Sequence, residues 1–181
     1  YVVGNYVGKV ALAAVGASTP IINMLIGFFM GISTGAGVVI AQFFGAGDLS
    51  KMKKAIHNSI ALTLVIGVVL TVIGLVFNDP ILKAIGVPND VFSEASTYLS
   101  IYFWSLIFVM IYNMGSGILR SVGDSKRPLY FLIFSSIINI VLDFLFVKNF
   151  GFGVAGAGYA TLIAQAISAI MVMYVLMKTE D

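Results

Sequence analysis

The chain has 181 residues, of which 60% are hydrophobic and 10% are charged, and its mean hydropathy is +1.04. Soluble domains carry about 25% charged residues, so the composition excludes a soluble domain and predicts an all-α integral membrane protein. The net charge of +2 says little alone, and no nucleic-acid partner is indicated, because few aromatic residues accompany the basic ones. The lack of cysteine excludes disulfides, thiolate zinc sites and cysteine nucleophiles.

Five membrane-spanning helices are predicted, at about residues 20–44, 55–77, 94–119, 128–147 and 154–177. Each contains about 20 to 26 residues, which is enough to cross a hydrocarbon core of about 30 Å at a rise of about 1.5 Å per residue.

The first predicted span begins at the sequence STP. Ser18 or Thr19 is expected to cap this helix, and Pro20 suits its first turn because the missing N–H costs no hydrogen bond there. Residues 1–17 are interpreted as a helix tail and a connection, in which residues 1–7 are the outer end of a truncated preceding helix. Restoring that helix would give a lobe of six spans.

The distribution of lysine and arginine predicts the orientation in the membrane. Seven of these residues follow the first, third and fifth predicted spans: Lys51, Lys53, Lys54, Arg120, Lys126, Arg127 and Lys178. Three lie on the opposite side: Lys9, Lys83 and Lys148. The side with seven is therefore expected to face the cytoplasm, in a multi-pass protein of the cell membrane that is surrounded by lipid.

Polar side chains share one face of the fourth predicted span. Ser135, Asn139 and Asp143 follow one another at intervals of four residues. Because a central aspartate costs about 2.5–3.5 kcal/mol in lipid, this face is expected to point into the bundle. A carboxylate there can take up a proton or supply oxygen to Na⁺, so we interpret Asp143 as an ion-binding residue. The alternative is that Asp143 lies near the membrane interface, or is protonated and hydrogen-bonded within the bundle.

The fifth predicted span carries a matching polar face, with Thr161 and Gln165 four residues apart. The two helices are expected to be antiparallel neighbours, which predicts Thr161 at the level of Asp143 and Gln165 at the level of Asn139. Asn139 and Thr161 would then add neutral oxygens to a possible Na⁺ site at Asp143.

Further polar residues are candidates for a substrate-facing cavity, together with Gln165: Asn113, Tyr112 and Gln42. Gly31 and Gly35 have the GxxxG spacing that lets membrane helices approach closely, so they are predicted to pack against a neighbouring helix. The alternative for these glycines is flexible bending during transport.

Four sequence blocks are distributed between residues 11 and 165: ALAAVGASTPIINMLIGFFMGISTGAGVVIAQFFGAGD, YNMGSGILRSVGDSKRPLYF, NIVLDFLFV and GVAGAGYATLIAQ. In combination they resemble the N-terminal half of a multidrug and toxic compound extrusion (MATE) family transporter. The resemblance implies a six-helix lobe of a twelve-helix transporter, with the first helix largely truncated and a C-terminal lobe of the same protein as a partner. It also implies export of cationic or amphipathic compounds in exchange for Na⁺ or H⁺.

The resemblance also implies an ion site, because archaeal and bacterial members use an asparagine and an aspartate on the fifth helix and a threonine on the sixth. Asn139, Asp143 and Thr161 match these positions. A further aspartate on the family's first helix would fall about two residues before Tyr1. A polar residue near Asn113 is expected to approach the site or the cavity.

Three functions are weighed. An ion-coupled antiporter without a cofactor beyond its coupling ion is favoured; no GxxxxGK[ST] phosphate loop is present in the sequence to indicate ATP hydrolysis. A lipid-linked oligosaccharide flippase of the same superfamily is the first alternative, although every Lys and Arg maps to helix ends or loops. The second is an inactive fragment without its second lobe. An enzyme is not expected, because no nucleophile–base pair and no metal cluster is evident.

Overall fold

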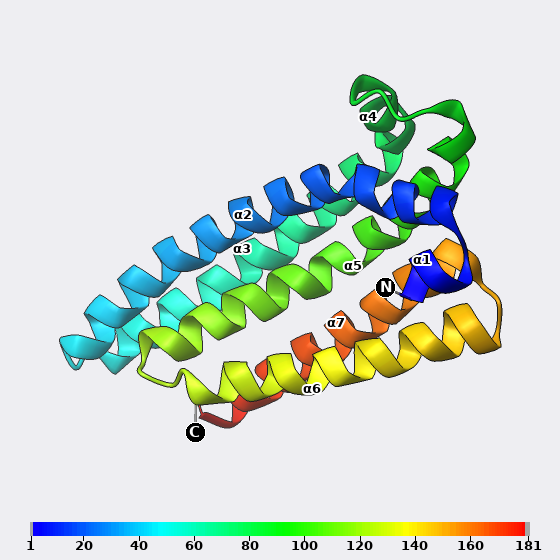
Figure 1. Cartoon of the computed structure of the whole chain (residues 1–181). Helices are drawn as coiled ribbons and strands as arrows, with labels where there is room; N and C mark the ends of the chain where they lie inside the picture. The colour runs from blue at the N-terminus through cyan, green and yellow to red at the C-terminus, as the bar shows by residue number, and fades with distance from the viewer. Residues whose placement is uncertain (1, 180–181) are drawn as a thin grey trace.

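Helix α5 (Asn89–Ser121) runs through the middle of the bundle and contacts three long neighbours, which are α2 (Lys9–Gly45), α3 (Leu49–Val76) and α7 (Gly153–Thr179) (Figure 1). The computed structural model describes residues 2–179. In the 18-residue segment that represents each spanning helix, 50% of the α5 residues are buried, against 11–33% for the other four helices. This helix therefore supplies the largest part of the core.

The fourth long helix, α6 (Lys126–Asp143), packs chiefly against α7 and continues as a π-helix, η1 (Phe144–Asn149). Two short helices lie at the same end of the bundle as η1 (Figure 1). They are α1 (Val2–Tyr6), which contacts η1 and α2, and α4 (Asn78–Ala84), which joins α3 to α5. Helix α4 was not predicted from the sequence.

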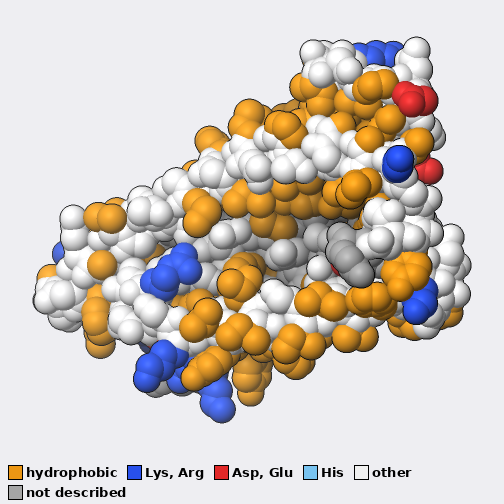
Figure 2. Space-filling view, in the orientation of Figure 1, with side chains coloured by type: hydrophobic (Ala, Val, Ile, Leu, Met, Phe, Trp, Pro, Cys, Tyr) orange, Lys and Arg blue, Asp and Glu red, His pale blue; other side chains and the backbone are white. Residues whose placement is uncertain are grey.

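Large apolar side chains cover much of the visible surface of the bundle (Figure 2). Trp104 and Ile170 on α5 and α7 are 60% and 66% exposed, an arrangement that water disfavours and hydrocarbon accepts. Five helices in the described part of the chain are long and apolar enough to cross a membrane. The predicted all-α membrane fold is confirmed.

The predicted start of the first span is wrong. Helix α2 begins at Lys9, so Pro20 lies inside it and no cap forms at STP. Instead, the hydroxyls of Ser18 and Thr19 donate to the carbonyls four residues earlier, at 3.1 and 3.0 Å. Such bonds help a membrane helix to continue through a proline, and the alanine-rich segment before it favours helix strongly.

Contact between α3 and α5 depends on small residues. Gly74 faces the ring of Phe103, and a Cβ at this glycine would overlap the ring. One turn away, the hydroxyl of Thr71 donates to the carbonyl of Phe103 at 3.1 Å. The glycine pair that was predicted to pack behaves differently. Gly31 and Gly35 are exposed with nothing within 4 Å of a Cβ built on them, so their predicted packing does not occur among the described residues.

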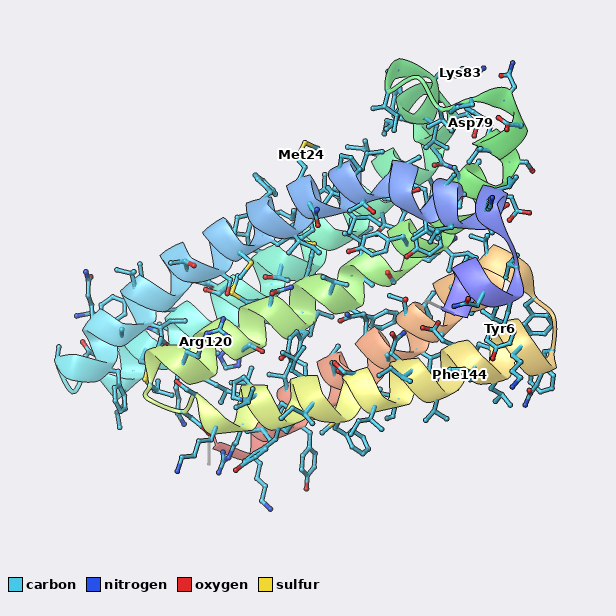
Figure 3. All side chains as sticks on the ribbon, in the orientation of Figure 1. Tyr6, Met24, Asp79, Lys83, Arg120 and Phe144 are labelled. Atoms are coloured by element: carbon cyan, nitrogen blue, oxygen red, sulfur yellow. The ribbon has the colours of Figure 1, made fainter. Side chains whose placement is uncertain are left out.

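The connections α2–α3 and α5–α6 lie at one end of the bundle, opposite α4 and η1 (Figure 1). Figure 3 shows Arg120 toward the first of these ends and Asp79 with Lys83 at the other. The seven basic residues counted above belong to the first end by their positions on the helices, so we call it the basic end.

Candidate ion-binding site

Asp143 is the last residue of α6, immediately before the π-helix η1. In this segment the helix is wider than an α-helix, and its end is marked by an i→i−5 bond from the N–H of Phe150 to the carbonyl of Leu145, at 3.0 Å. Single turns of π-helix are frequent at functional sites. No feature of the sequence indicated it, because the apolar pattern continues unbroken through residues 144–147.

Asn139 and Thr161 meet between α6 and α7. The side-chain amide nitrogen of Asn139 donates to the hydroxyl oxygen of Thr161 at 3.5 Å, the outer limit for such a bond. The Thr161 hydroxyl in turn donates to the carbonyl of Ala157 at 3.0 Å, one turn earlier on α7. The hydroxyl proton is therefore used within α7, and the oxygen of Thr161 acts as an acceptor toward α6.

The carboxylate of Asp143 is partly buried, and its Oδ1 atom is fully enclosed without a hydrogen-bond partner among the described residues. A buried acceptor in this state costs free energy unless a proton, a cation or water satisfies it. Asp143 is not part of any cluster of three or more His, Cys, Asp or Glu residues among residues 2–179. The available donor set is thus one carboxylate with neutral oxygens, which suits a proton or Na⁺.

The hydrogen bond between Asn139 and Thr161 brings the polar faces of α6 and α7 together. The finer register, with Thr161 at the level of Asp143 and Gln165 at the level of Asn139, stays a prediction. The fourth span was predicted to end at residue 147, whereas the helix continues as η1 to Asn149.

The four proposed cavity residues are distributed over different parts of the bundle. The Tyr112 hydroxyl donates to the carbonyl of Pro128 at 2.9 Å and ties α5 to the start of α6. The Asn113 amide donates to its own helix at Val109, at 2.8 Å, while its backbone carbonyl accepts from the Ser33 hydroxyl at 2.8 Å. The two glutamines differ in exposure: Gln42 is exposed near the basic end and Gln165 is partly buried on α7. Among the described residues, no hydrogen bond links any of these four side chains to Asp143.

Two aromatic residues near the site were not singled out from the sequence. Tyr98 of α5 lies within electrostatic range of the Asp143 carboxylate. Tyr6 of α1 meets Phe144 edge-on at 6.2 Å between ring centroids, and both are labelled in Figure 3. The Lys148 ammonium lies 5.2 Å from the centre of the Tyr6 ring. Tyrosines near a membrane surface normally indicate only interfacial anchoring. Nothing in the sequence therefore distinguished these two tyrosines from interfacial anchors.

The chain is similar to known proteins over nearly its whole length. The model of the MatE family matches residues 1–145. "Probable multidrug resistance protein YoeA" of Bacillus subtilis (strain 168) is 37% identical over 180 residues, which cover 97% of this chain and 39% of that protein. "Multidrug export protein MepA" of Staphylococcus aureus (strain bovine RF122 / ET3-1) is 26% identical over the whole chain and 40% of its own length.

Solved structures show the same fold. "Crystal structure of MATE in the bent conformation" is 31% identical with a TM-score of 0.94, covering 99% of this chain and 41% of that one. An outward-facing MATE transporter of the MOP superfamily gives a TM-score of 0.93 over 99% of this chain and 40% of its own. The chain therefore spans about 40% of the length of these relatives, as the predicted lobe would. It belongs to the MATE family, represented by the MatE model.

Proposed function

We propose that this chain is the N-terminal lobe of an ion-coupled multidrug exporter of the cell membrane, in which Asp143 binds the coupling ion. The relatives are named as multidrug resistance and export proteins, and their length implies that a second lobe completes the transporter. Cationic or amphipathic compounds are the substrates proposed. Na⁺ and H⁺ are both chemically compatible with the donor set.

The observation that carries the proposal is the enclosed Oδ1 atom of Asp143, which has no hydrogen-bond partner among the described residues. A carboxylate in this position is more stable when a proton or a cation neutralises it. Its neighbours on the same helix face, Ser135 and Asn139, are buried and partly buried. This burial supports a site on the inner side of α6 rather than toward lipid.

Binding of Na⁺ would require a change at Asn139. Its amide nitrogen faces the Thr161 oxygen at 3.5 Å, whereas a cation needs the amide oxygen. Rotation of the amide about its terminal bond exchanges the two atoms without moving the helix. Loss of the weak bond to Thr161 would then be compensated by two oxygen contacts to the ion. Protonation of Asp143 requires no such rotation.

Uptake of either ion changes the charge inside the lobe by one unit. The change falls at the junction of α6 and η1, where the hydrogen-bond pattern already switches from i→i−4 to i→i−5. A π-helical turn within an α-helix is frequent at functional sites. We propose that a shift at this junction couples ion binding to repacking of α6 against α7, and so to alternating access.

The transport assay uses the full-length protein in liposomes, with efflux of a cationic dye driven either by a Na⁺ gradient at equal pH or by a pH gradient without Na⁺. Asp143→Asn is expected to abolish the ion-dependent part of efflux. Asp90→Asn, at the exposed start of α5, is the matched control and is expected to keep it. Full ion-coupled efflux in Asp143→Asn would contradict the proposal.

A flippase for lipid-linked sugars is the second candidate. A solved MOP superfamily transporter from Pyrococcus furiosus is 31% identical with a TM-score of 0.92, and the reverse polarity of its binding pocket suggests a different function for that protein. A phosphate-bearing substrate would call for cations within the membrane, whereas the lysines and arginines of residues 2–179 lie at helix ends and in connections. This distribution favours the exporter. A lipid-flipping assay on the same liposomes distinguishes the two.

A lobe without activity of its own is the third possibility. The chain covers about 40% of the length of its relatives and exposes many large apolar side chains, so we propose that residues 1–181 alone do not transport. Reconstitution of residues 1–181 tests this directly. Ion-coupled efflux by that fragment would contradict it.

A further inference from the structure

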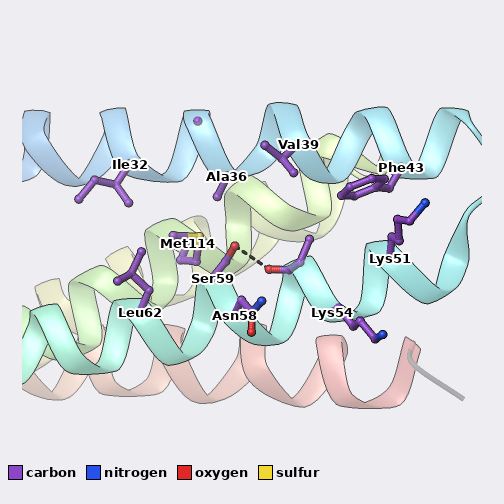
Figure 4. Close-up of a pocket in the computed structure, with 12 residues that line it drawn as sticks. Ile32, Ala36, Val39, Phe43, Lys51, Lys54, Asn58, Ser59, Leu62 and Met114 are labelled. Carbon is purple, nitrogen blue, oxygen red and sulfur yellow. Dashed lines mark hydrogen bonds between the residues drawn. The ribbon is translucent and has the colours of Figure 1, made fainter.

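A cavity of about 540 Å³ lies between α2 and α3 near the basic end, far along the bundle from Asp143 (Figure 4). Its polarity changes along its length. Figure 4 shows the side chains of Lys51 and Lys54 toward one end, and those of Ile32 and Leu62 toward the other. The cationic end is the one nearer the α2–α3 connection, and the apolar end lies deeper along the helices.

A second cavity of about 460 Å³ adjoins the first on the other side of α3. Lys54 and Asn58 line both, so the two cavities form one continuous surface around these side chains. Ser50, Lys53 and His57 complete the lining of the second cavity. We call the two cavities together the basic cradle.

The charge of the basic cradle is strongly one-sided. Asp48 is the one carboxylate in residues 45–78, against three lysines in the same segment. It is held at 2.9 Å from the ammonium of Lys51, and it also caps α3 by accepting from the Lys51 N–H at 3.0 Å. Asp48 therefore neutralises Lys51, and a net positive charge remains around Lys54.

The apolar end of the cavity is an open trough. Gly35 lines it, and a Cβ built on this glycine meets no atom within 4 Å. Val39 and Leu62 are exposed on either side, so that an extended hydrocarbon chain can lie between α2 and α3. Among the polar lining groups, Ser59 already donates to the carbonyl of Ala55 at 2.8 Å (Figure 4, dashed line).

We propose that the basic cradle binds an anionic phospholipid, with its phosphate at Lys54 and Asn58 and one acyl chain in the trough lined by Gly35. A phosphate between lysine and an amide gains charge-assisted hydrogen bonds. Basic pockets between membrane helices on the cytoplasmic side are typical sites for anionic headgroups. A zwitterionic lipid has no net charge to offset that of the lysines, and a free phosphate leaves the trough empty.

Native mass spectrometry of the full-length protein tests the proposal, with lipid retention measured after exchange into phosphatidylglycerol or phosphatidylcholine. Lys54→Gln is expected to reduce phosphatidylglycerol retention about fivefold, the equivalent of about 1 kcal/mol for one lysine at an anionic surface. Lys126→Gln is the charge control, because Lys126 belongs to the same end but lines neither cavity. It is expected to retain lipid as the unmodified protein does.

The trough is tested by a steric block. Gly35→Leu is expected to displace the lipid without disturbing the helix, since space is open at this position. Gly27→Leu is the matched control, two turns away on the same helix and also open, but outside the cavity.

Equal retention of the two phospholipids, or equal retention by Gly35→Leu and Gly27→Leu, would overturn the proposal. Competition by glycerol phosphate as strong as that by the intact lipid would show an anion site instead. Cross-linking of the cradle to the second lobe, with no lipid retained, would show that protein covers it.

Discussion

The amide nitrogen of Asn139 lies 3.5 Å from the hydroxyl oxygen of Thr161, and this contact is the point at which the polar faces of α6 and α7 meet. Thr161 is committed as a donor to Ala157 on its own helix. It therefore presents an oxygen, rather than a proton, to whatever lies between the two helices. Loss of this oxygen should therefore weaken ion binding.

Replacement of Thr161 by valine removes that oxygen while keeping the branched shape of the side chain. We expect the ion concentration for half-maximal efflux by the full-length protein to rise about fivefold, which corresponds to the loss of one contact worth about 1 kcal/mol, the size of one net hydrogen bond. Thr161→Ser keeps the hydroxyl and is expected to retain most of the activity. The measurement is the ion concentration for half-maximal efflux; an equal response of the two variants would remove Thr161 from the site.

The bond between Tyr112 and the Pro128 carbonyl predicts a structural effect rather than a functional one. Tyr112→Phe leaves the ring in place and removes the hydroxyl that ties α5 to α6 at 2.9 Å. We expect the free energy of unfolding to fall by about 1 kcal/mol, measured as a lower midpoint in thermal unfolding, with ion dependence of efflux unchanged. A changed ion dependence would place Tyr112 in the transport path after all.

Close packing of Gly74 on Phe103 predicts that even one methyl group is disruptive. A Cβ at position 74 overlaps the ring, so Gly74→Ala is expected to destabilise the fold by about 1–3 kcal/mol. The double variant with Phe103→Leu provides the control, because it makes room for the methyl group. Thermal unfolding of the single and double variants gives the interaction free energy between positions 74 and 103. Strictly additive effects would show that the two residues do not meet.

Asp48 predicts a measurable titration outside the membrane. The side-chain hydrogen bond and ion pair with Lys51 lower the pKa of Asp48 below its ordinary value of 3.8. A lowered pKa means that this contact stabilises the fold above about pH 4 and that the contribution is lost as the pH falls through the folded-state value. Lys51→Gln is expected to return the pKa of Asp48 toward its ordinary value, as followed by carboxyl carbon chemical shifts. An unchanged titration would mean that the ion pair does not persist in solution.

The sequence alone determined the class of the protein and most of its helices. In lipid, each backbone polar group must be satisfied within its own helix, so long apolar runs can adopt little else, and local composition is a sufficient guide. The same reasoning determined which face of α6 carries Ser135, Asn139 and Asp143, because a helix sets the angle between residues four apart. Family resemblance then indicated which of these polar residues belong to an ion site.

Tertiary structure decided how the helices begin and how they meet. Ser18 and Thr19 can either cap a helix or bond back within one, and only the complete helix from Lys9 shows that they do the second. The contact that joins Asn139 to Thr161 is made between two helices, α6 and α7, and it needs the packing of one against the other. These are contacts between residues distant in sequence, whose energies differ by small amounts between neighbouring registers. Periodicity along one helix contains no information about them.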